Sequence, residues 1–199
     1  MARNLYAELH PIPEQIEASR LYLRAVQMGD GALVRVAVEE SFEQLSRWMP
    51  WANHVPTLSE SETFARESAA QFRSKEEFNF LLLHREDDRH LGNLGLHSIH
   101  WDVPRFEIGY WLRSSQQGHG YATEAVRAIC SLLFREQKAE RIEIRCDDRN
   151  ASSAAVAERA GFTLEATLHN HARDTAGGLR NTRIYALFPE VVSHHERFS

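Results

Sequence analysis

Apolar residues alternate with polar ones, or form short runs, in some stretches of the chain and recur at helical spacing in others. The first pattern is typical of strands and the second of amphipathic helices. Strands are predicted at 20–26, 78–84, 90–100, 106–112, 141–146, 162–171 and 179–188. Helices are predicted at 30–38 and, after a break, at 42–48, and then at 57–75, 122–134 and 150–160. The order of these elements predicts an α/β fold, with a mixed sheet and helices on both faces.

The organisation along the chain is that of one domain. With 199 residues, of which 43% are hydrophobic, the chain is long enough for one well-buried core, and no internal repeat divides it. Residues 1–19, which contain Pro11 and Pro13, are expected to form an extended arm. The domain is expected to span 20–190, followed by a C-terminal tail at 191–199.

Composition narrows the range of functions. The formal charge of −5, from 23 basic and 28 acidic side chains, argues against nucleic acid as the main partner, since that needs clustered Lys and Arg. No apolar run approaches the length that spans a membrane, and the first residues lack the apolar stretch of a signal peptide. Two cysteines, Cys130 and Cys146, suggest no disulfide framework, so we expect a protein of the reducing cytoplasm.

The most informative stretch is a glycine turn between a predicted strand and a predicted helix. Glycines at positions 118 and 120 leave backbone N–H groups unobstructed at the start of the helix. Partial positive charge gathers there, and phosphate groups bind well. The turn therefore predicts a cradle for a diphosphate, formed by Gln117, Gly118, His119, Gly120, Tyr121 and Ala122.

Two common phosphate-binding motifs do not fit this turn. No lysine follows either glycine, which excludes a nucleoside-triphosphate loop, and Thr123 stands where a dinucleotide fingerprint wants Gly or Ala. What remains is the pattern Q-x-x-G-x-A, with Gln117, Gly120 and Ala122 at the fixed positions. This pattern resembles the acyl-coenzyme-A (acyl-CoA) pyrophosphate loop of the GNAT superfamily of N-acetyltransferases.

A second stretch agrees with this resemblance. Asn150 is a good N-cap for an alanine-rich helical segment that stops at Gly161. In the GNAT superfamily an N-x-x-S segment at this place lies beside the pantetheine and the thiol, and Asn150 and Ser153 match it. By themselves, the two residues also suit the ordinary role of small polar residues in a first helical turn.

Four further stretches, at 21–24, 48–51, 107–112 and 120–125, are similar to the Rim-type branch of the superfamily, which acetylates the N-termini of ribosomal proteins. The resemblance runs from about Arg20 to Phe188 and implies a single-domain, mostly antiparallel seven-stranded sheet. It also implies acetyl-CoA as the acyl donor and an amine acceptor such as a ribosomal-protein N-terminus. A homodimer is a further expectation, because members of the family often dimerise.

The chemistry that the resemblance implies is direct attack of an amine on the thioester, without a covalent enzyme intermediate. Backbone groups of the strand before the glycine turn, here those of Trp111, Leu112 and Arg113, are expected to bind the pantetheine and the carbonyl oxygen. Ser153 is expected to protonate the departing thiolate.

The residue that accepts a proton from the amine is the open point. Rim-type relatives often use a glutamate on the strand after the second motif, and Ala172 stands where we expect it. Glu107 resembles a position used as a base elsewhere in the superfamily. His169 and His171 are the second alternative, because residues two apart on a strand point to the same face.

Two further pairs of residues have both a functional and a structural interpretation. Trp48 and Trp51 fall in a stretch that lines the acceptor side in Rim-type relatives; core packing is the favoured role of Trp48, and for Trp51 both roles stay open. His97 and His100 are three apart on a predicted strand, so we expect them to face opposite sides and to bind no metal together.

Three functions stay open at this point. The leading one is an acetyl-CoA-dependent N-acetyltransferase that acts on a protein N-terminus. The second keeps the chemistry but has a small amine or polyamine as acceptor, or another acyl group. The third, from another class, is a non-catalytic module that binds acyl-CoA, in which Ala172 marks lost activity.

Overall fold

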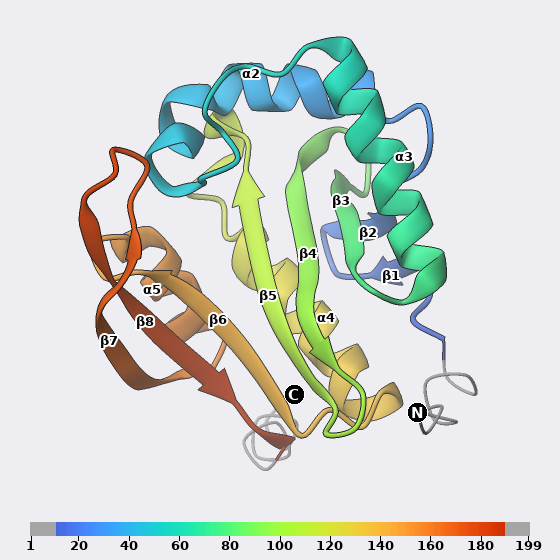
Figure 1. The fold of residues 1–199 in the computed structure, drawn as a ribbon. Helices are drawn as coiled ribbons and strands as arrows, with labels where there is room; N and C mark the ends of the chain where they lie inside the picture. The colour runs from blue at the N-terminus through green and yellow to red at the C-terminus, as the bar shows by residue number, and fades with distance from the viewer. Residues whose placement is uncertain (1–10, 190–199) are drawn as a thin grey trace.

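An eight-stranded mixed sheet runs through residues 11–189, the part of the chain that the structure, a computed structural model, describes (Figure 1). Its strand order is β1-β2-β3-β4-β5-β6-β8-β7, and every neighbouring pair is antiparallel except β5 and β6. The predicted mixed, mostly antiparallel sheet is confirmed, with one strand more than the seven expected. The strands are β1 (Gln15–Glu17), β2 (Leu21–Ala25), β3 (Phe78–His84), β4 (His90–His100), β5 (Arg105–Leu112), β6 (Arg141–Asp147), β7 (Thr163–Arg173) and β8 (Leu179–Leu187). The helices are α2 (Gly31–Trp48), α3 (Leu58–Ser74), α4 (Tyr121–Glu136) and α5 (Ala151–Arg159), with a short 3-10 helix η1 (Ser114–Gln116).

The additional strand is β1, which lies within the segment expected to be an arm. Ile16 pairs with Leu23 of β2 and is buried, 6% exposed, so this part of the segment belongs to the sheet. A strand of three residues is too short to show alternation in the sequence. The rest of the expected arm, 1–10, and the expected tail, 191–199, lie outside the described residues.

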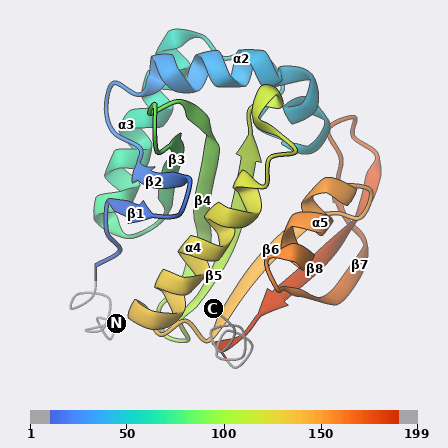
Figure 2. The same ribbon diagram turned by 180° about the vertical axis from the view of Figure 1, so that it is seen from behind.

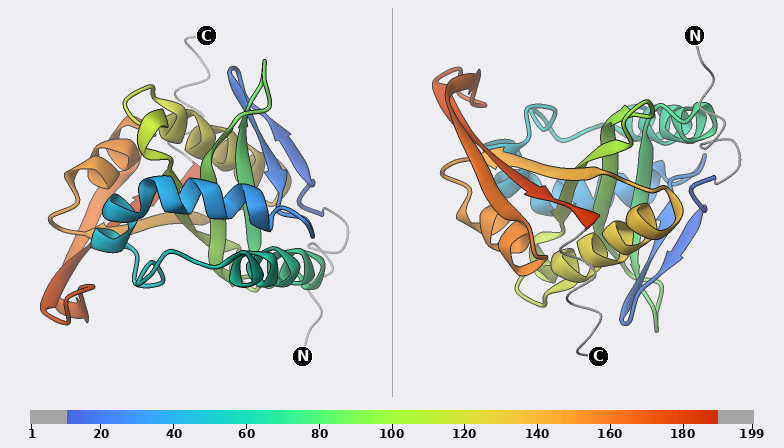
Figure 3. Two further views of the ribbon diagram at one scale, coloured as in Figure 1. Left: turned by 90° about the horizontal axis from the view of Figure 1, so that it is seen from above. Right: turned by 90° about the horizontal axis from the view of Figure 1, so that it is seen from below.

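The helices cover the sheet from both sides. Helices α2 and α3 lie on one side, which we call the α2 face, and α4 and α5 lie on the other, the α4 face (Figures 2 and 3). Successive residues of β3 show this division, since Phe80 and Leu82 join the large apolar cluster under α4 and α5, whereas Leu81 and Leu83 join a smaller one under α2. Within the described range, none of the helices combines the length and apolar character needed to cross a membrane.

Helix α2 is continuous, so the predicted break between 38 and 42 is wrong. The polar residues Glu40 and Ser41 lie in the predicted break, but neither a proline nor a glycine interrupts the helix there. Ser41 is buried, 1% exposed, and both side chains bond the segment that follows β5. These polar side chains therefore form tertiary hydrogen bonds and do not mark a helix end.

Other predicted element ends are confirmed. Thr57 and Glu60 form the capping box that begins α3. Asn150 caps α5 by accepting a hydrogen bond from the Ser153 N–H at 3.1 Å. The strands β7 and β8 are joined by a tight turn, in which the Gly177 N–H bonds the carbonyl of Asp174 at 2.9 Å.

The pairing between β5 and β6 ends early. It joins only residues 105–107 to residues 141–143, and beyond this point the two strands diverge (Figure 1). On its other edge β5 stays paired with β4 as far as Leu112. The C-terminal half of β5 therefore has a strand partner on one edge only, among the residues that the structure describes.

Backbone geometry shows which N–H groups of β5 face the diverging strand. The N–H of Arg113 bonds the carbonyl of Leu91, at the start of β4, at 2.9 Å. Because N–H groups point alternately to the two sides of a strand, those of Leu112, Tyr110 and Ile108 point away from β4, toward β6. Leu112 is thus placed as expected for a residue with a free amide. For Arg113, and by the same alternation for Trp111, the expectation is wrong, since their N–H groups point to β4 and that of Arg113 bonds Leu91.

Glu40 of α2 fixes the turn that follows β5. Its carboxylate accepts hydrogen bonds from the guanidinium of Arg113 and from both the N–H and the hydroxyl of Ser115. Partial burial raises the pKa of Glu40, but these hydrogen bonds outweigh that effect and lower the pKa from 4.5 to about 2. The carboxylate is therefore ionised at neutral pH and holds the turn against α2.

Glu40→Gln is expected to lower the free energy of unfolding at neutral pH by up to about 3 kcal/mol, because the ionised carboxylate is lost. Since the folded-state pKa lies below its ordinary value of 4.5, this contribution is complete above about pH 4.5 and is lost as the pH falls toward 2. Denaturant titrations of both proteins between about pH 7 and 3 measure the difference. Glu43→Gln, an exposed acid of the same helix, is the control, and equal effects of the two variants at pH 7 would contradict the account.

Candidate functional site

The predicted cradle lies where β5 passes through η1 into α4. Gly118 and Gly120 have φ angles of 79° and 82°, a left-handed conformation that glycine adopts without steric cost. Gly120 is the N-cap of α4 and has no side chain with which to bond the first N–H groups of the helix. These groups are open to a ligand, and the helix dipole favours an anionic one.

A buried hydroxyl lies beside these N–H groups. Thr123, in the first turn of α4, is 8% exposed, and its hydroxyl has no hydrogen-bond partner among the described residues. A buried polar atom without a partner is uncommon in folded proteins. The open N–H groups fit a bound diphosphate, whereas the Thr123 hydroxyl is enclosed by protein and presents no surface to a ligand.

Arg20, just before β2, holds the cradle from outside. Its guanidinium pairs with Glu124 of α4 at 2.7 Å, donates to the His119 carbonyl at 3.0 Å and lies 4.9 Å from the centre of the Tyr121 ring. Its backbone N–H also bonds Glu124, at 2.6 Å. Sequence reasoning missed this role, because Arg20 and its partners are about a hundred positions apart and no local pattern links them.

Gln117 ties the turn to two other elements. Its side-chain amide donates to Gln44 of α2 and, at 3.4 Å, to the carbonyl of Leu112 at the end of β5. His119 is exposed and its ring lies 5.8 Å from that of Tyr121, while Tyr121 and Ala122 are buried against the apolar cluster. The six residues of the predicted cradle are therefore brought together, and the side chain of Gln117 connects the turn to α2 and to the end of β5.

The second predicted motif lies against the free edge of β5. The hydroxyl of Ser153 is 3.1 Å from the hydroxyl of Tyr110, and the same Tyr110 hydroxyl donates to the Ser153 carbonyl at 3.1 Å. Ser153 also forms a hydrogen bond with the thiol of Cys146 on β6. Tyr110 was not among the predicted site residues, since its position in the strand gives no sign of this contact.

Burial keeps these groups protonated. It raises the pKa of Tyr110 well above its usual range, although the hydrogen bond with Ser153 opposes the shift. Burial likewise raises the pKa of the Cys146 thiol, again against a hydrogen bond from Ser153. At neutral pH the cluster is uncharged and holds three protons that hydrogen bonds position.

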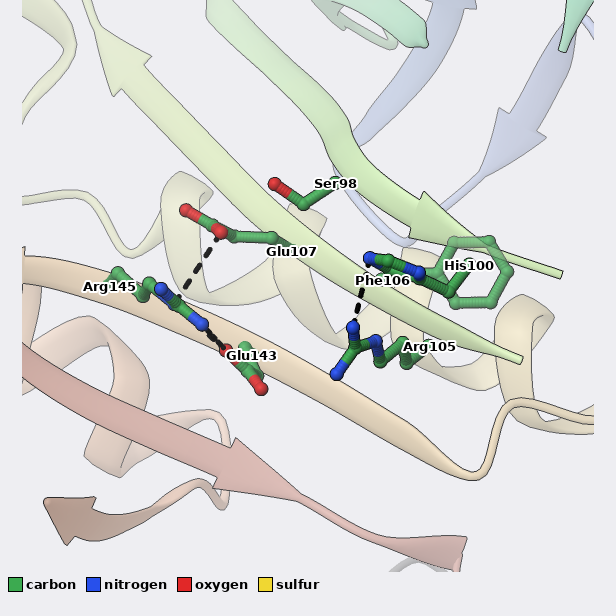
Figure 4. A pocket seen from close by; sticks show the side chains of 7 residues that line it. All are labelled: Ser98, His100, Arg105, Phe106, Glu107, Glu143 and Arg145. Carbon is green, nitrogen blue, oxygen red and sulfur yellow. Dashed lines mark hydrogen bonds and ion pairs between the residues drawn. The ribbon is translucent and has the colours of Figure 1, made fainter. Parts of the chain in front are cut away.

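Glu107 lies on the α2 face, as the alternation along β5 requires. Its carboxylate is 3.5 Å from the guanidinium of Arg145, which also pairs with Glu143 at 2.8 Å (Figure 4). Glu107 is 27% exposed and borders a shallow pocket. That pocket is lined by Ser98, His100, Arg105, Phe106, Glu107, Glu143 and Arg145.

His97 and His100 lie on the same face, so the expectation of opposite faces is wrong. The register of β4 against β5 shifts between them, where Ser98 adopts a positive φ of 47°. His97 is thereby opposite Glu107, and His100 is opposite Arg105, to which it bonds at 3.0 Å. Among residues 11–189, no group of three or more His, Cys, Asp or Glu side chains is placed to hold a metal ion.

A register shift also changes the surroundings of His169 and His171. The pairing of β7 with β8 slips between Leu168 and Ala172, and Asn170 has a positive φ of 50°. Regular alternation therefore does not apply here, so it does not place the two histidines on one face. The Nδ1 atom of His171 is 3.1 Å from the hydroxyl of Thr182 on β8.

The two tryptophans of the α2–α3 connection are partly exposed. Trp48 is the last residue of α2 and is 36% exposed, so the favoured interpretation of core packing is wrong for it. Trp51 is 51% exposed, and its ring lies 6.3 Å from that of Trp111 on β5. Trp51 thus presents an aromatic surface next to the α2 face of β5.

The arrangement separates two kinds of chemistry along one strand. The open N–H groups of α4 and the hydroxyls of Ser153 and Tyr110 can bind an anion and supply a proton. Glu107, on the opposite face of β5, can accept one. Such a division suits a transfer reaction between two substrates.

Comparison with known proteins agrees with this reading. Residues 20–163 match the family described as acetyltransferase (GNAT) domain. The chain is 30% identical over 154 residues to the probable N-acetyltransferase YjcK of Bacillus subtilis (strain 168). The matched region covers 75% of this chain and 84% of that protein.

Two solved structures share the fold. The ribosomal L7/L12 alpha-N-protein acetyltransferase RimL, in complex with coenzyme A, matches with a TM-score of 0.83 at 24% identity. The match covers 89% of this chain and 99% of the RimL chain. The microcin C7 self-immunity acetyltransferase MccE, in complex with acetyl-CoA and AMP, matches with a TM-score of 0.83 at 22% identity. The match covers 90% of this chain and 99% of the MccE chain. The family match over most of the chain, together with the site described above, shows that this protein belongs to the GNAT family of N-acetyltransferases.

Proposed function

We propose that the protein transfers the acetyl group of acetyl-CoA to the α-amine of a protein N-terminus, by direct attack while both substrates are bound. The observation that carries this proposal is the uncapped start of α4, which follows a strand whose C-terminal half has, among residues 11–189, a strand partner on one edge only. Acetyl-CoA supplies the activated acyl group. The ribosomal-protein acetyltransferase among the structural neighbours supports the choice of acceptor.

The residues of this chain have separate binding tasks in the proposal. The N–H groups at 118–123 bind the diphosphate, since helix dipole and geometry both favour an anion there. The N–H groups of Tyr110 and Leu112, on the free edge of β5, bind the pantetheine arm and the thioester oxygen. A fixed N–H donor at that oxygen stabilises the negative charge that develops on it.

Ser153 supplies a proton to the departing sulfur. Its hydroxyl is held by Tyr110 at 3.1 Å, and the raised pKa of Tyr110 keeps that neighbour protonated at neutral pH. Tyr110 therefore acts as a positioning residue that holds the Ser153 oxygen in place. Because the Tyr110 hydroxyl donates its single proton to the Ser153 carbonyl, the Ser153 hydroxyl donates to Tyr110, and it turns its proton toward the sulfur as the C–S bond breaks.

The chemistry of the acceptor favours an α-amine. An α-amine with a pKa near 7.8 is about 15% neutral at pH 7, whereas a lysine side chain near 10.4 is below roughly 0.1% neutral. A site without the expected glutamate, with Ala172 in its place, suits the acceptor that needs less help in losing a proton. Trp51, beside Trp111, offers a surface on which a peptide backbone can stack.

We further propose that the protein works in the cytoplasm. Both of its cysteines are buried and unpaired, as is usual in a reducing compartment.

A screen of acceptors tests the function. Thiol release from acetyl-CoA is measured with short peptides that have free N-termini, with the same peptides N-terminally blocked but containing lysine, and with polyamines. We expect turnover with the free N-termini only. Turnover confined to polyamines would replace the proposed acceptor, and binding of coenzyme A without turnover of any amine would indicate a non-catalytic module.

Gly120→Asp is expected to weaken coenzyme A binding at least about tenfold, because a carboxylate at the start of α4 repels the diphosphate and forces an unfavourable φ on a residue with a Cβ. Isothermal titration calorimetry with coenzyme A measures the affinity. Gly177→Asp, at a glycine of similar φ in the β7–β8 turn, is the matched control and should bind normally. Equal affinities of the two variants would refute the cradle.

Ser153→Ala is expected to lower kcat at least about tenfold while leaving coenzyme A affinity nearly unchanged, because a proton donor is lost but no contact to the diphosphate is. Steady-state kinetics and calorimetry on the same preparation separate the two effects. Ser152→Ala, the exposed neighbour in the first turn of α5, serves as control. An unchanged kcat in Ser153→Ala would remove this residue from the mechanism.

A further inference from the structure

We propose that His97 is the residue that accepts the proton of the attacking amine, with Glu77 as its positioning partner. This inference rests on the proposed function and identifies the base that the sequence left open. It concerns a histidine that the sequence pattern gave no role, since His97 and His100 were expected to bind no metal together.

His97 occupies the α2 face directly opposite Glu107. The two residues are paired across β4 and β5, so their side chains start next to each other on the same side of the sheet. His97 is 38% exposed, and a substrate on that face can therefore reach it. Glu107 is paired with Arg145 at 3.5 Å, whereas among residues 11–189 the ion-pair partner of His97 is the acidic Glu77.

Two facing glycines make room for the imidazole. Gly95 of β4 pairs with Gly109 of β5, and both are on the α2 face. A Cβ added at Gly95 would lie 2.7 Å from the Cε1 and Nε2 atoms of His97, and one added at Gly109 would lie 3.1 Å from Nε2. Any larger residue at Gly95 would displace the ring, so the pair forms a shelf on which the imidazole lies.

The shelf places Nε2 next to the same part of β5 that the other reacting groups contact. Gly109, over which Nε2 lies, directly precedes Tyr110, whose hydroxyl holds Ser153 on the opposite face. Gly109 is also two residues nearer than Glu107 to the end of β5 that has a free edge. A proton acceptor and a proton donor thus lie on the two faces of β5, at neighbouring positions along the strand.

Glu77 determines which nitrogen is available. Its carboxylate is 3.6 Å from Nδ1 of His97, a distance in the range of an ion pair but longer than a hydrogen bond. A carboxylate beside Nδ1 favours the tautomer with the proton on that atom and stabilises the ring once it becomes charged. Nε2 then keeps its lone pair, and it has no hydrogen-bond partner within residues 11–189.

The proton balance of the step is complete. The amine nitrogen forms the C–N bond while the C–S bond breaks, the proton leaving nitrogen goes to Nε2, and the departing sulfur takes a proton from Ser153. Loss of the proton from His97 and its return to Ser153 through water restore the enzyme.

The test replaces His97 by Asn and measures kcat, both KM values and coenzyme A affinity with the acceptor on which the wild type is most active. We expect kcat to fall about 100-fold, as for a general base, while coenzyme A affinity and the melting temperature stay close to wild type. His100→Asn is the matched control, because it removes an imidazole from the same strand and face, and its kcat should not change. His97→Ala, assayed with and without added imidazole, provides a second measurement, in which added base should restore part of the activity.

Glu77→Gln tests the positioning role. It should lower kcat about fivefold to tenfold with unchanged KM, whereas Glu76→Gln, at the neighbouring exposed acid, should have no effect. Wild-type kcat in His97→Asn, or a large loss of kcat in Glu107→Gln instead, would overturn the inference but leave the acetyltransferase function standing. A wild-type protein that acetylates no amine would overturn both.

Discussion

The early end of the pairing between β5 and β6 is the constraint on which the rest of the site depends. Two parallel strands that stay in register use the backbone groups of their shared edge, and nothing else can bind there. Here β6 pairs with β8 from Ile142 to Asp147 but with β5 only over residues 141–143. The edge of β5 beyond Glu107 is left for a ligand, and Ser153 comes to lie beside Tyr110 at that edge.

The cradle at the start of α4 is held by residues from outside it. A turn with glycine at two positions has few side chains of its own, so its shape depends on neighbouring elements. Arg20 fixes it from the residue before β2, and Glu40 and Gln44 fix the preceding segment from α2. Donors that are already in place cost little to organise when an anion binds, which explains why these polar contacts surround the turn.

Features that depend on local backbone chemistry could be predicted from the sequence. The glycine turn, the Asn150 cap and the capping box of α3 each act within a few residues, so their sequence patterns indicate the structure directly. The roles of Arg20 and Tyr110 could not be predicted, because their partners lie 99 or more and 43 positions away. One extra residue in β4 was enough to reverse the expected side of His100, since a register shift moves every later side chain to the other face.

Amide chemical shifts of the ¹⁵N-labelled protein, recorded during titration with coenzyme A, test the central claim most directly. The account predicts that the largest changes occur at Tyr110 and Leu112 on the free edge of β5 and at the amides between Gly118 and Thr123, and that the Arg113 amide, bonded to Leu91, changes less. Changes confined to another surface, such as the groove between β1 and α4, with none at Leu112 or Gly120, would contradict it.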